Sequence, residues 1–125
     1  MKKPKILIVE DSQAYQDTYA RHLGERVEII AAYSTAQAHQ FFAENSDIVL
    51  IVMDGCVDSP DYMDTGALVK EIRKTFKGPM IAASRSSYIR QKLTDLGCDH
   101  KCEKNDVPRQ VWGLIVRLQL DVATG

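Results

Sequence analysis

The chain has 125 residues, of which 45% are hydrophobic, so it is long enough to form one domain around its own core. Its 16 basic and 17 acidic residues leave a net charge of -1, which disfavours direct binding to nucleic acid. Near the amino terminus, basic residues precede an apolar run that covers only Ile6–Val9. Because that run is too short for a signal peptide or a membrane span, we expect a cytoplasmic protein with no membrane partner.

The first half of the chain alternates apolar runs with helical segments. Three runs rich in β-branched or other apolar residues predict strands at Lys5–Glu10, Arg26–Ala31 and Asp47–Met53. A helix is predicted over Ser12–Leu23, with Gly24 closing it, and another over Thr35–Ala43, with Ser34 as its cap. The third strand is apolar almost throughout, as expected of a central strand that is covered on both faces.

The second half continues the alternation. Apolar spacing predicts a helix over Asp64–Phe76, and a short strand follows at Met80–Ala83. Another helix is predicted over Ser87–Leu96, and then a polar strand, Asp99–Glu103, which an edge position would tolerate.

A last helix follows the fifth predicted strand. Asp106 can cap this helix, and Pro108 suits its first turn. Its apolar stripe consists of Val107, Val111, Leu114, Ile115, Leu118 and Val122. Five β–α repeats with short connections predict an α/β fold of three layers, α/β/α, in which a doubly wound parallel sheet of five strands is covered by five helices. We predict a single domain over residues 1–125.

Residues suited to phosphoryl chemistry follow four of the five predicted strands. Glu10 and Asp11 end the first strand, Asp54 the third, Ser84 the fourth and Lys104 the fifth. Alone, each has an ordinary explanation, because acidic residues after strands often cap helices or form turns. Together they should meet, since function in such sheets gathers at the carboxyl ends of the strands. Three neighbouring carboxylates repel one another, and Mg²⁺ relieves that repulsion well because it prefers oxygen ligands.

Four separated motifs resemble the successive signatures of the response-regulator receiver domain of two-component signalling. They are ILIVEDS (Ile6–Ser12), IVMD (Ile51–Asp54), PMIAAS (Pro79–Ser84) and GCDHKCEK (Gly97–Lys104). The resemblance implies a flavodoxin-like sheet with the strand order 2-1-3-4-5. It also implies a partner, either a sensor histidine kinase or a phosphotransfer protein, that donates a phosphoryl group.

The resemblance also assigns roles to individual residues. Asp54 would be the phosphoacceptor, and Mg²⁺ would be held by Asp11, Glu10, Asp54 and the backbone carbonyl of Cys56. Lys104 and the Ser84 hydroxyl would pair with phosphoryl oxygens. Their movement would reshape the face built from the last two helices and the last strand, which would serve an unidentified output partner or a homodimer. Such a protein is a switch and not a multiple-turnover enzyme.

Three features depart from the family pattern. Lys101 stands where the family often has an aromatic switch residue, and Asn105 replaces the proline that commonly follows the lysine, so the lysine loop need not contain a cis peptide. The loop Gly55–Asp64 is enlarged, and its acidic residues favour a solvated loop over a calcium site, because the glycine and glutamate spacing of a calcium loop is absent. The stretch from Ser84 to Lys104 is about two residues short of the common length.

Two other functions compete with the phosphoryl switch. The departures at Lys101 and Asn105, together with the altered loop after Asp54, favour a receiver-like interaction module that works without phosphorylation. An aspartyl-phosphate phosphatase is disfavoured, because such enzymes place a second acid two residues after the nucleophile, where this chain has Cys56. Three cysteines, Cys56, Cys98 and Cys102, make an odd set in a chain without an export signal, so we expect reduced thiols. Cys98 and Cys102 flank His100, but no second pair of soft ligands stands nearby in the sequence, so the pattern supports a zinc site only weakly.

Overall fold

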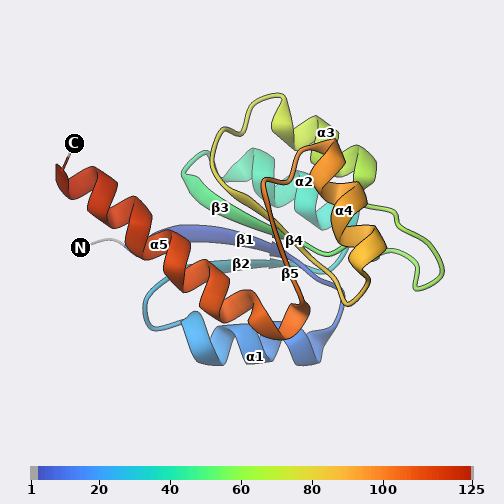
Figure 1. Ribbon diagram of the computed structural model, residues 1–125, viewed down its shortest axis with the longest axis horizontal. Coiled ribbons are helices and arrows are strands. Elements are labelled where there is room, and N and C mark those ends of the chain that lie inside the picture. The colour runs from blue at the N-terminus through green and yellow to red at the C-terminus, as the bar shows by residue number, and fades with distance from the viewer. Residues whose placement is uncertain (1–2, 125) are drawn as a thin grey trace.

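The computed structural model describes the backbone of residues 3–124 and the side chains of residues 3–118. Its strands are β1 (Lys5–Val9), β2 (Glu28–Ala32), β3 (Ile48–Met53), β4 (Met80–Ala83) and β5 (His100–Cys102). Its helices are α1 (Gln13–Leu23), α2 (Thr35–Glu44), α3 (Gly66–Arg73), α4 (Ser87–Leu96) and α5 (Val107–Thr124), with a 3₁₀ turn, η1 (Lys104–Asp106), before α5. The strands pair in parallel in the order β2-β1-β3-β4-β5 (Figure 1), which confirms the predicted flavodoxin-like α/β fold.

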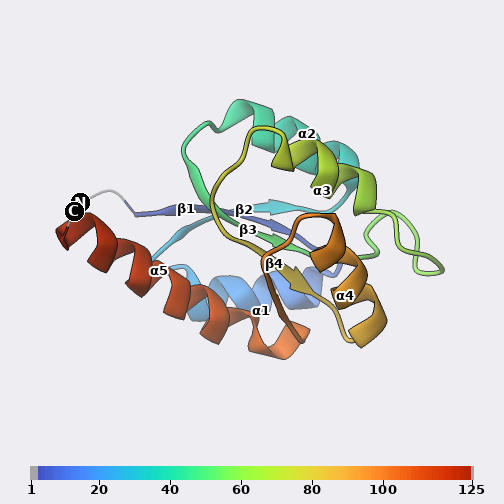
Figure 2. The same cartoon turned by 45° about the horizontal axis from the view of Figure 1, so that its top comes forward.

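Alternating side chains of the central strands build two separate cores. In β1, Leu7 and Val9 belong to the core beneath α2, α3 and α4, whereas Ile6 and Ile8 belong to the core beneath α1 and α5. All four side chains have no exposed surface. This period of two follows from the pleat of a strand, and Figure 2 shows the two helical layers on opposite sides of the sheet. Burial on both faces explains why the central strands read as unbroken apolar runs.

Serine side chains fix where three helices begin. The hydroxyls of Ser12, Ser34 and Ser86 accept hydrogen bonds from the backbone amides of Tyr15, Gln37 and Ile89 respectively. Each bond satisfies one of the amides that the first turn of a helix leaves without a partner. The predicted cap at Ser34 is therefore confirmed.

Three predicted boundaries, in two elements, were wrong by more than one residue. β2 begins at Glu28 and not at Arg26, because the amides of Arg26 and Val27 both donate to the Leu23 carbonyl in the turn that follows α1. Helix α3 covers Gly66–Arg73, which is shorter than the predicted Asp64–Phe76.

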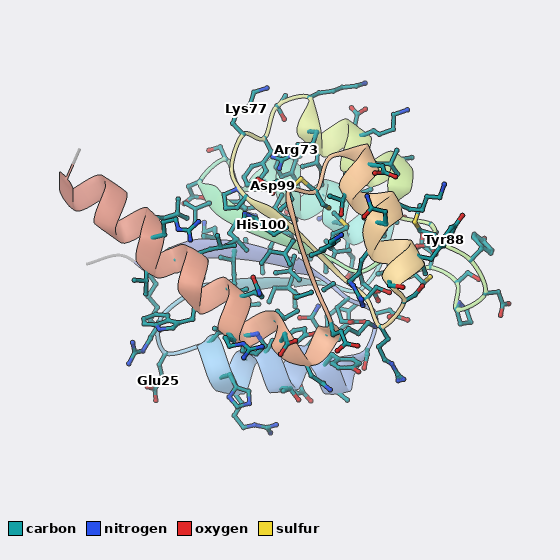
Figure 3. All side chains as sticks on the ribbon, in the orientation of Figure 1. Glu25, Arg73, Lys77, Tyr88, Asp99 and His100 are labelled. Carbon is teal, nitrogen blue, oxygen red and sulfur yellow. The ribbon has the colours of Figure 1, made fainter. Side chains whose placement is uncertain are left out.

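Local hydrogen bonds shorten α3 at both ends. At its start, the Asp64 carboxylate and the Thr65 hydroxyl are bound to the preceding loop. At its end, the Arg73 guanidinium donates to the carbonyls of Phe76 and Gly78, and it pairs with Asp99 at 3.2 Å. Figure 3 shows Arg73 and Asp99 side by side. These contacts turn the chain away from the helix and into β4.

The carboxyl-terminal helix buries the predicted stripe. Val107, Val111, Leu114 and Ile115 are buried against the sheet, and Leu118 packs at the edge of the same core. The predicted stripe member Val122 lies outside the described side chains. Asp106 lies in η1, and its carboxylate accepts a hydrogen bond from the Arg109 guanidinium at 2.8 Å. Among the helices of residues 3–124, none is long and apolar enough to cross a membrane.

Candidate functional site

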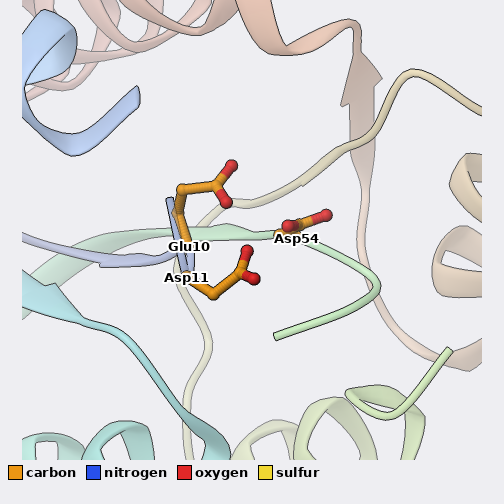
Figure 4. A group of neighbouring side chains, drawn as sticks. All are labelled: Glu10, Asp11 and Asp54. Atoms are coloured by element: carbon orange, nitrogen blue, oxygen red, sulfur yellow. The ribbon is translucent and has the colours of Figure 1, made fainter. Parts of the chain in front are cut away.

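The acidic residues predicted at the carboxyl edge of the sheet lie together. Glu10 and Asp11 follow β1, and Asp54 follows the neighbouring strand β3. The Asp54 amide donates to the Val9 carbonyl at 3.0 Å, so the two strand ends are held in register. One carboxylate oxygen from each of Glu10, Asp11 and Asp54 lies within 4.8 Å of the others (Figure 4). The side chains come from two strand ends and converge on one point.

Lys104 reaches this cluster from the end of β5. Its ammonium nitrogen lies 3.0 Å from Glu10 Oε1 and 3.0 Å from Asp54 Oδ2. The Glu10 and Asp54 side chains are only 3% and 6% exposed, so water screens this charge cluster weakly. One ammonium faces three carboxylates, which leaves an excess of negative charge at a buried site.

That excess changes the acid–base properties of the cluster. Burial, together with the nearby charge of Asp54, raises the pKa of Glu10 from 4.5 to about 8. Burial alone would lower the pKa of Lys104, but its bonds to Glu10 and Asp54 outweigh burial and raise it. Both directions have one meaning: the site gains by binding additional positive charge, either a proton or a cation.

The donor set fits a hard divalent cation. Its ligand atoms are carboxylate oxygens, and Mg²⁺ takes one or two carboxylates while it keeps several waters. Asp11 is exposed whereas Glu10 and Asp54 are buried, so the cluster is open to solvent on the Asp11 side. A cation and a phosphate oxygen could reach the cluster from that side.

Two other predicted site residues lie at the same edge of the sheet. Ser84 follows β4 and is buried, and its hydroxyl accepts a hydrogen bond from the Ser86 amide at 3.1 Å. Cys56 lies two residues after Asp54, and burial raises the pKa of its thiol, which keeps the sulfur protonated and unreactive. Lys104 therefore forms ion pairs with the acidic cluster, whereas the Ser84 hydroxyl forms its hydrogen bond with the Ser86 amide, in the loop that follows β4.

The enlarged loop Gly55–Asp64 is ordered by two of its own aspartates. The Asp64 carboxylate accepts hydrogen bonds from the amides of Val57, Asp58 and Ser59 at 2.7–2.9 Å. Asp58, Pro60, Asp61 and Tyr62 are exposed, as expected of a solvated loop, but the loop also folds around a charged acceptor at its own carboxyl end.

Asp58 ties this loop to α2. Its carboxylate accepts hydrogen bonds from both the amide and the hydroxyl of Thr35, in the first turn of α2, and these bonds lower its pKa. The chain segment after the candidate acceptor is thus attached to a helix on one side of the site.

Sequence reasoning missed several residues that support the site. The Gln16 amide nitrogen donates to the Ile8 and Glu10 carbonyls from inside the core, and the Thr65 hydroxyl donates to the Asp54 carbonyl at 2.7 Å. Tyr15 and Tyr19 of α1 both contact Lys104. The sequence did hold one indication of these contacts: Gln16 and Tyr19 lie on the apolar face of a predicted helix, where a buried polar group needs a hydrogen-bond partner.

No protein-family model matches the chain. No curated protein matches it. Solved structures do match. A two-component response regulator from Clostridium difficile has a TM-score of 0.78 and 20% identity, with 93% of this chain and 98% of that chain covered. A Francisella response regulator receiver domain has a TM-score of 0.73 and 21% identity, with coverage of 93% and 99%.

A third match is the BeF3-activated N-terminal receiver domain of Klebsiella pneumoniae RstA, with a TM-score of 0.71, 20% identity and coverage of 93% and 96%. At such identities the likeness concerns the fold. The chain is a flavodoxin-like α/β protein with an acidic cluster at the carboxyl edge of its sheet. Within that class, it has the fold of the receiver domains of two-component response regulators.

Proposed function

We propose that this chain is a single receiver domain that accepts a phosphoryl group on Asp54 and acts as a signalling switch. One observation carries the proposal: a buried aspartate ends the central strand β3, with two further carboxylates on one side and an ammonium 3.0 Å away. In the family that the chain resembles, the phosphoacceptor aspartate stands at this position, and here the same residue belongs to the charge cluster. The chain would act as a phosphoacceptor and not as a multiple-turnover enzyme.

The chemistry follows from the charges at the site. An Asp54 carboxylate oxygen attacks the phosphorus of a phosphohistidine, so the P–N bond breaks, a P–O bond forms and the imidazole leaves. Mg²⁺, held by Glu10, Asp11, Asp54 and the Cys56 carbonyl, would supply neutralising charge to the carboxylates and to a phosphoryl oxygen. Lys104 would move from its Glu10 contact to pair with a second oxygen.

Ser84 would bind the third phosphoryl oxygen. For this, its hydroxyl must turn from acceptor of the Ser86 amide to donor toward the phosphoryl group. That turn would release a bond at the entry to α4, whose Arg90 guanidinium also donates to the Ser84 carbonyl at 2.6 Å. The change at the site would therefore reach α4, β5 and α5, the face that we assign to output or to a homodimer.

The partners follow from this role. A sensor histidine kinase or a phosphotransfer protein would donate the phosphoryl group, and the chain would work in the cytoplasm, where such donors present their phosphohistidine.

Acetyl phosphate tests the proposal without the unknown kinase. In the presence of Mg²⁺, the intact mass of the wild-type protein should increase by one phosphoryl group. The mass of Asp54→Asn should not increase, and neither should that of the wild type when a chelator removes Mg²⁺. Asp61→Asn is the matched control, because Asp61 is an exposed aspartate of the same loop. Equal labelling of wild type and Asp54→Asn would refute the assignment of Asp54.

A second candidate is a receiver-like interaction module that needs no phosphorylation. It is favoured by the Lys101 ammonium, which donates to the Gln91 side chain of α4 at 3.0 Å, at a position where the resembled family often has an aromatic switch. Partner affinity that is equal for wild type and Asp54→Ala, with and without phosphodonor, would support this function over the first.

A further inference from the structure

Lys104 begins the 3₁₀ turn η1, which a single residue separates from the shortest strand of the sheet. Strand β5 has three residues and pairs only with β4, so it lies at the edge. The next residue is Asn105, and no cis peptide bond occurs in residues 3–124. An edge segment of this kind has few backbone partners. The Lys104 ammonium nevertheless lies 3.0 Å from two buried carboxylates.

Helix α1 supplies the missing support for this segment. The Tyr19 hydroxyl donates a hydrogen bond to the Lys104 carbonyl at 2.9 Å, and that carbonyl also accepts the Val107 amide. Tyr19 is 1% exposed, so its ring is fixed in the core between α1 and α5. Figures 1 and 2 both show the start of α5 beside α1. Burial raises the pKa of Tyr19, so the hydroxyl remains protonated and able to donate.

The other end of Lys104 rests on the same helix. Its ammonium nitrogen lies 4.8 Å from the centre of the Tyr15 ring, within the range of a cation–π interaction. Tyr15 and Tyr19 are one helical turn apart, and their rings stack with centroids 6.0 Å apart. The aromatic pair therefore contacts the lysine at its backbone and at its charged group.

We propose that Tyr19 is a positioning residue for phosphoryl transfer, which acts by holding the Lys104 backbone so that the ammonium reaches Asp54. Tyr15 completes this support beneath the ammonium. The inference rests on the proposed function, because it assumes that Lys104 stabilises the transferred phosphoryl group. It assigns a role in the reaction to helix α1, which carries neither the acidic cluster nor the lysine.

Tyr19→Phe tests the role, because it removes one hydroxyl and keeps the buried ring. With acetyl phosphate and saturating Mg²⁺, the maximal rate of Asp54 phosphorylation should fall roughly three- to tenfold, as loss of one buried hydrogen bond predicts. Saturating Mg²⁺ keeps the metal site filled, so any change in Mg²⁺ affinity that a displaced ammonium causes does not affect this rate. Ile115→Val is the control, since Ile115 packs in the same core and its truncation lowers stability without touching Lys104.

A double-mutant cycle separates positioning from general damage. If Tyr19 acts through Lys104, Tyr19→Phe should have no further effect on the rate in a Lys104→Met background. An equal fall in both backgrounds, or a rate for Tyr19→Phe that equals that of wild type or of Ile115→Val, would overturn the inference.

A second readout needs no phosphorylation. In NMR spectra without phosphodonor, the Lys104 ammonium signal should be resolved and protected from exchange in wild type and lost in Tyr19→Phe. An unchanged ammonium signal in Tyr19→Phe would refute the positioning role. Failure of wild type to react with acetyl phosphate would instead refute the proposed function, and the NMR comparison would still decide whether Tyr19 positions Lys104.

Discussion

The two ends of the sheet each hold a lysine among acidic residues, and the difference between them supports our proposal that the functional site lies at the carboxyl end. At the amino end, the Lys5 ammonium lies 3.0 Å from Asp47 and 3.9 Å from Glu28. At the carboxyl end, the Lys104 ammonium lies 3.0 Å from both Glu10 and Asp54. Both lysine side chains are 15% exposed.

The acidic partners differ in exposure. Those of Lys5 are 46% and 53% exposed, whereas those of Lys104 are 6% and 3% exposed. Water therefore screens the charges around Lys5, and that cluster joins residues at the starts of neighbouring strands. Around Lys104 the charges are desolvated and unbalanced, so the cluster costs stability unless it binds positive charge. The same type of ion pair is hydrated at one end of the sheet and buried at the other, where we propose that the reaction takes place.

Removing each lysine should reveal this difference most strongly. Lys104→Met keeps the aliphatic stem but leaves buried carboxylates without a counter-charge, so without Mg²⁺ the free energy of unfolding should fall by about 3 kcal/mol. Lys5→Met should lower it by about 1 kcal/mol or less, because its partners remain hydrated. Urea unfolding of both variants measures the contrast. Equal losses would show that the two clusters do not differ as described.

Glu10 predicts an unusual dependence of stability on pH. Its pKa is about 8 in the folded chain and 4.5 ordinarily, so between these values the folded state holds a proton that the unfolded state has released. Stability without a divalent cation should therefore fall by a few kcal/mol as pH rises from 4.5 to 8, and then level off. Urea unfolding across this range tests the sign.

Glu10→Gln is the control, because it removes the titrating group and should flatten this fall. Saturating Mg²⁺ should do the same by replacing the proton. A stability that rises over the same range in wild type would contradict the charge balance that we assign to the site.

Mg²⁺ and the Glu10 proton should compete for the same oxygens. Below pH 8 the apparent affinity for Mg²⁺ should rise up to about tenfold per pH unit, since binding releases a proton. Calorimetric titrations in two buffers of different ionisation enthalpy would count the protons released. Glu10→Gln should bind Mg²⁺ more weakly and release none. Mg²⁺ binding without proton release in wild type would exclude Glu10 from the site.

The loop aspartates should have smaller effects. Asp64→Ala removes a charged acceptor from three amides and should cost about 2 kcal/mol, whereas Asp58→Ala removes a cap from α2 and should cost about 1 kcal/mol. Asp61→Ala, on the same loop, should be nearly neutral. Urea unfolding ranks the three. If all three proved neutral, the enlarged loop would be the solvated segment that its composition suggested.

Much of the site was predictable because parallel strands share a carboxyl edge. That rule brought Glu10, Asp11, Asp54 and Lys104 together from positions up to ninety-four residues apart, counted from Glu10 to Lys104. The meeting of Ser84 with a phosphoryl group stays a prediction.

What the sequence could not reveal were contacts that depend on how helices pack. The position of Tyr19 on the apolar face of α1 signals that its hydroxyl needs a partner, but only the docking of α1 beside η1 identifies that partner as Lys104. Asp64 reads as the start of a helix, and it becomes a loop acceptor because the chain turns back toward it. Such partners are set by tertiary packing and not by local pattern.

The most direct test of the account is a crystal structure of the chain grown with Mg²⁺ and beryllofluoride, an analogue of a bound phosphoryl group. We predict beryllium on an Asp54 carboxylate oxygen, Mg²⁺ among Glu10, Asp11 and Asp54, and the Lys104 ammonium paired with a fluorine atom. A structure in which Asp54 stays free of beryllofluoride under these conditions, or in which Mg²⁺ binds away from the three carboxylates, would contradict it.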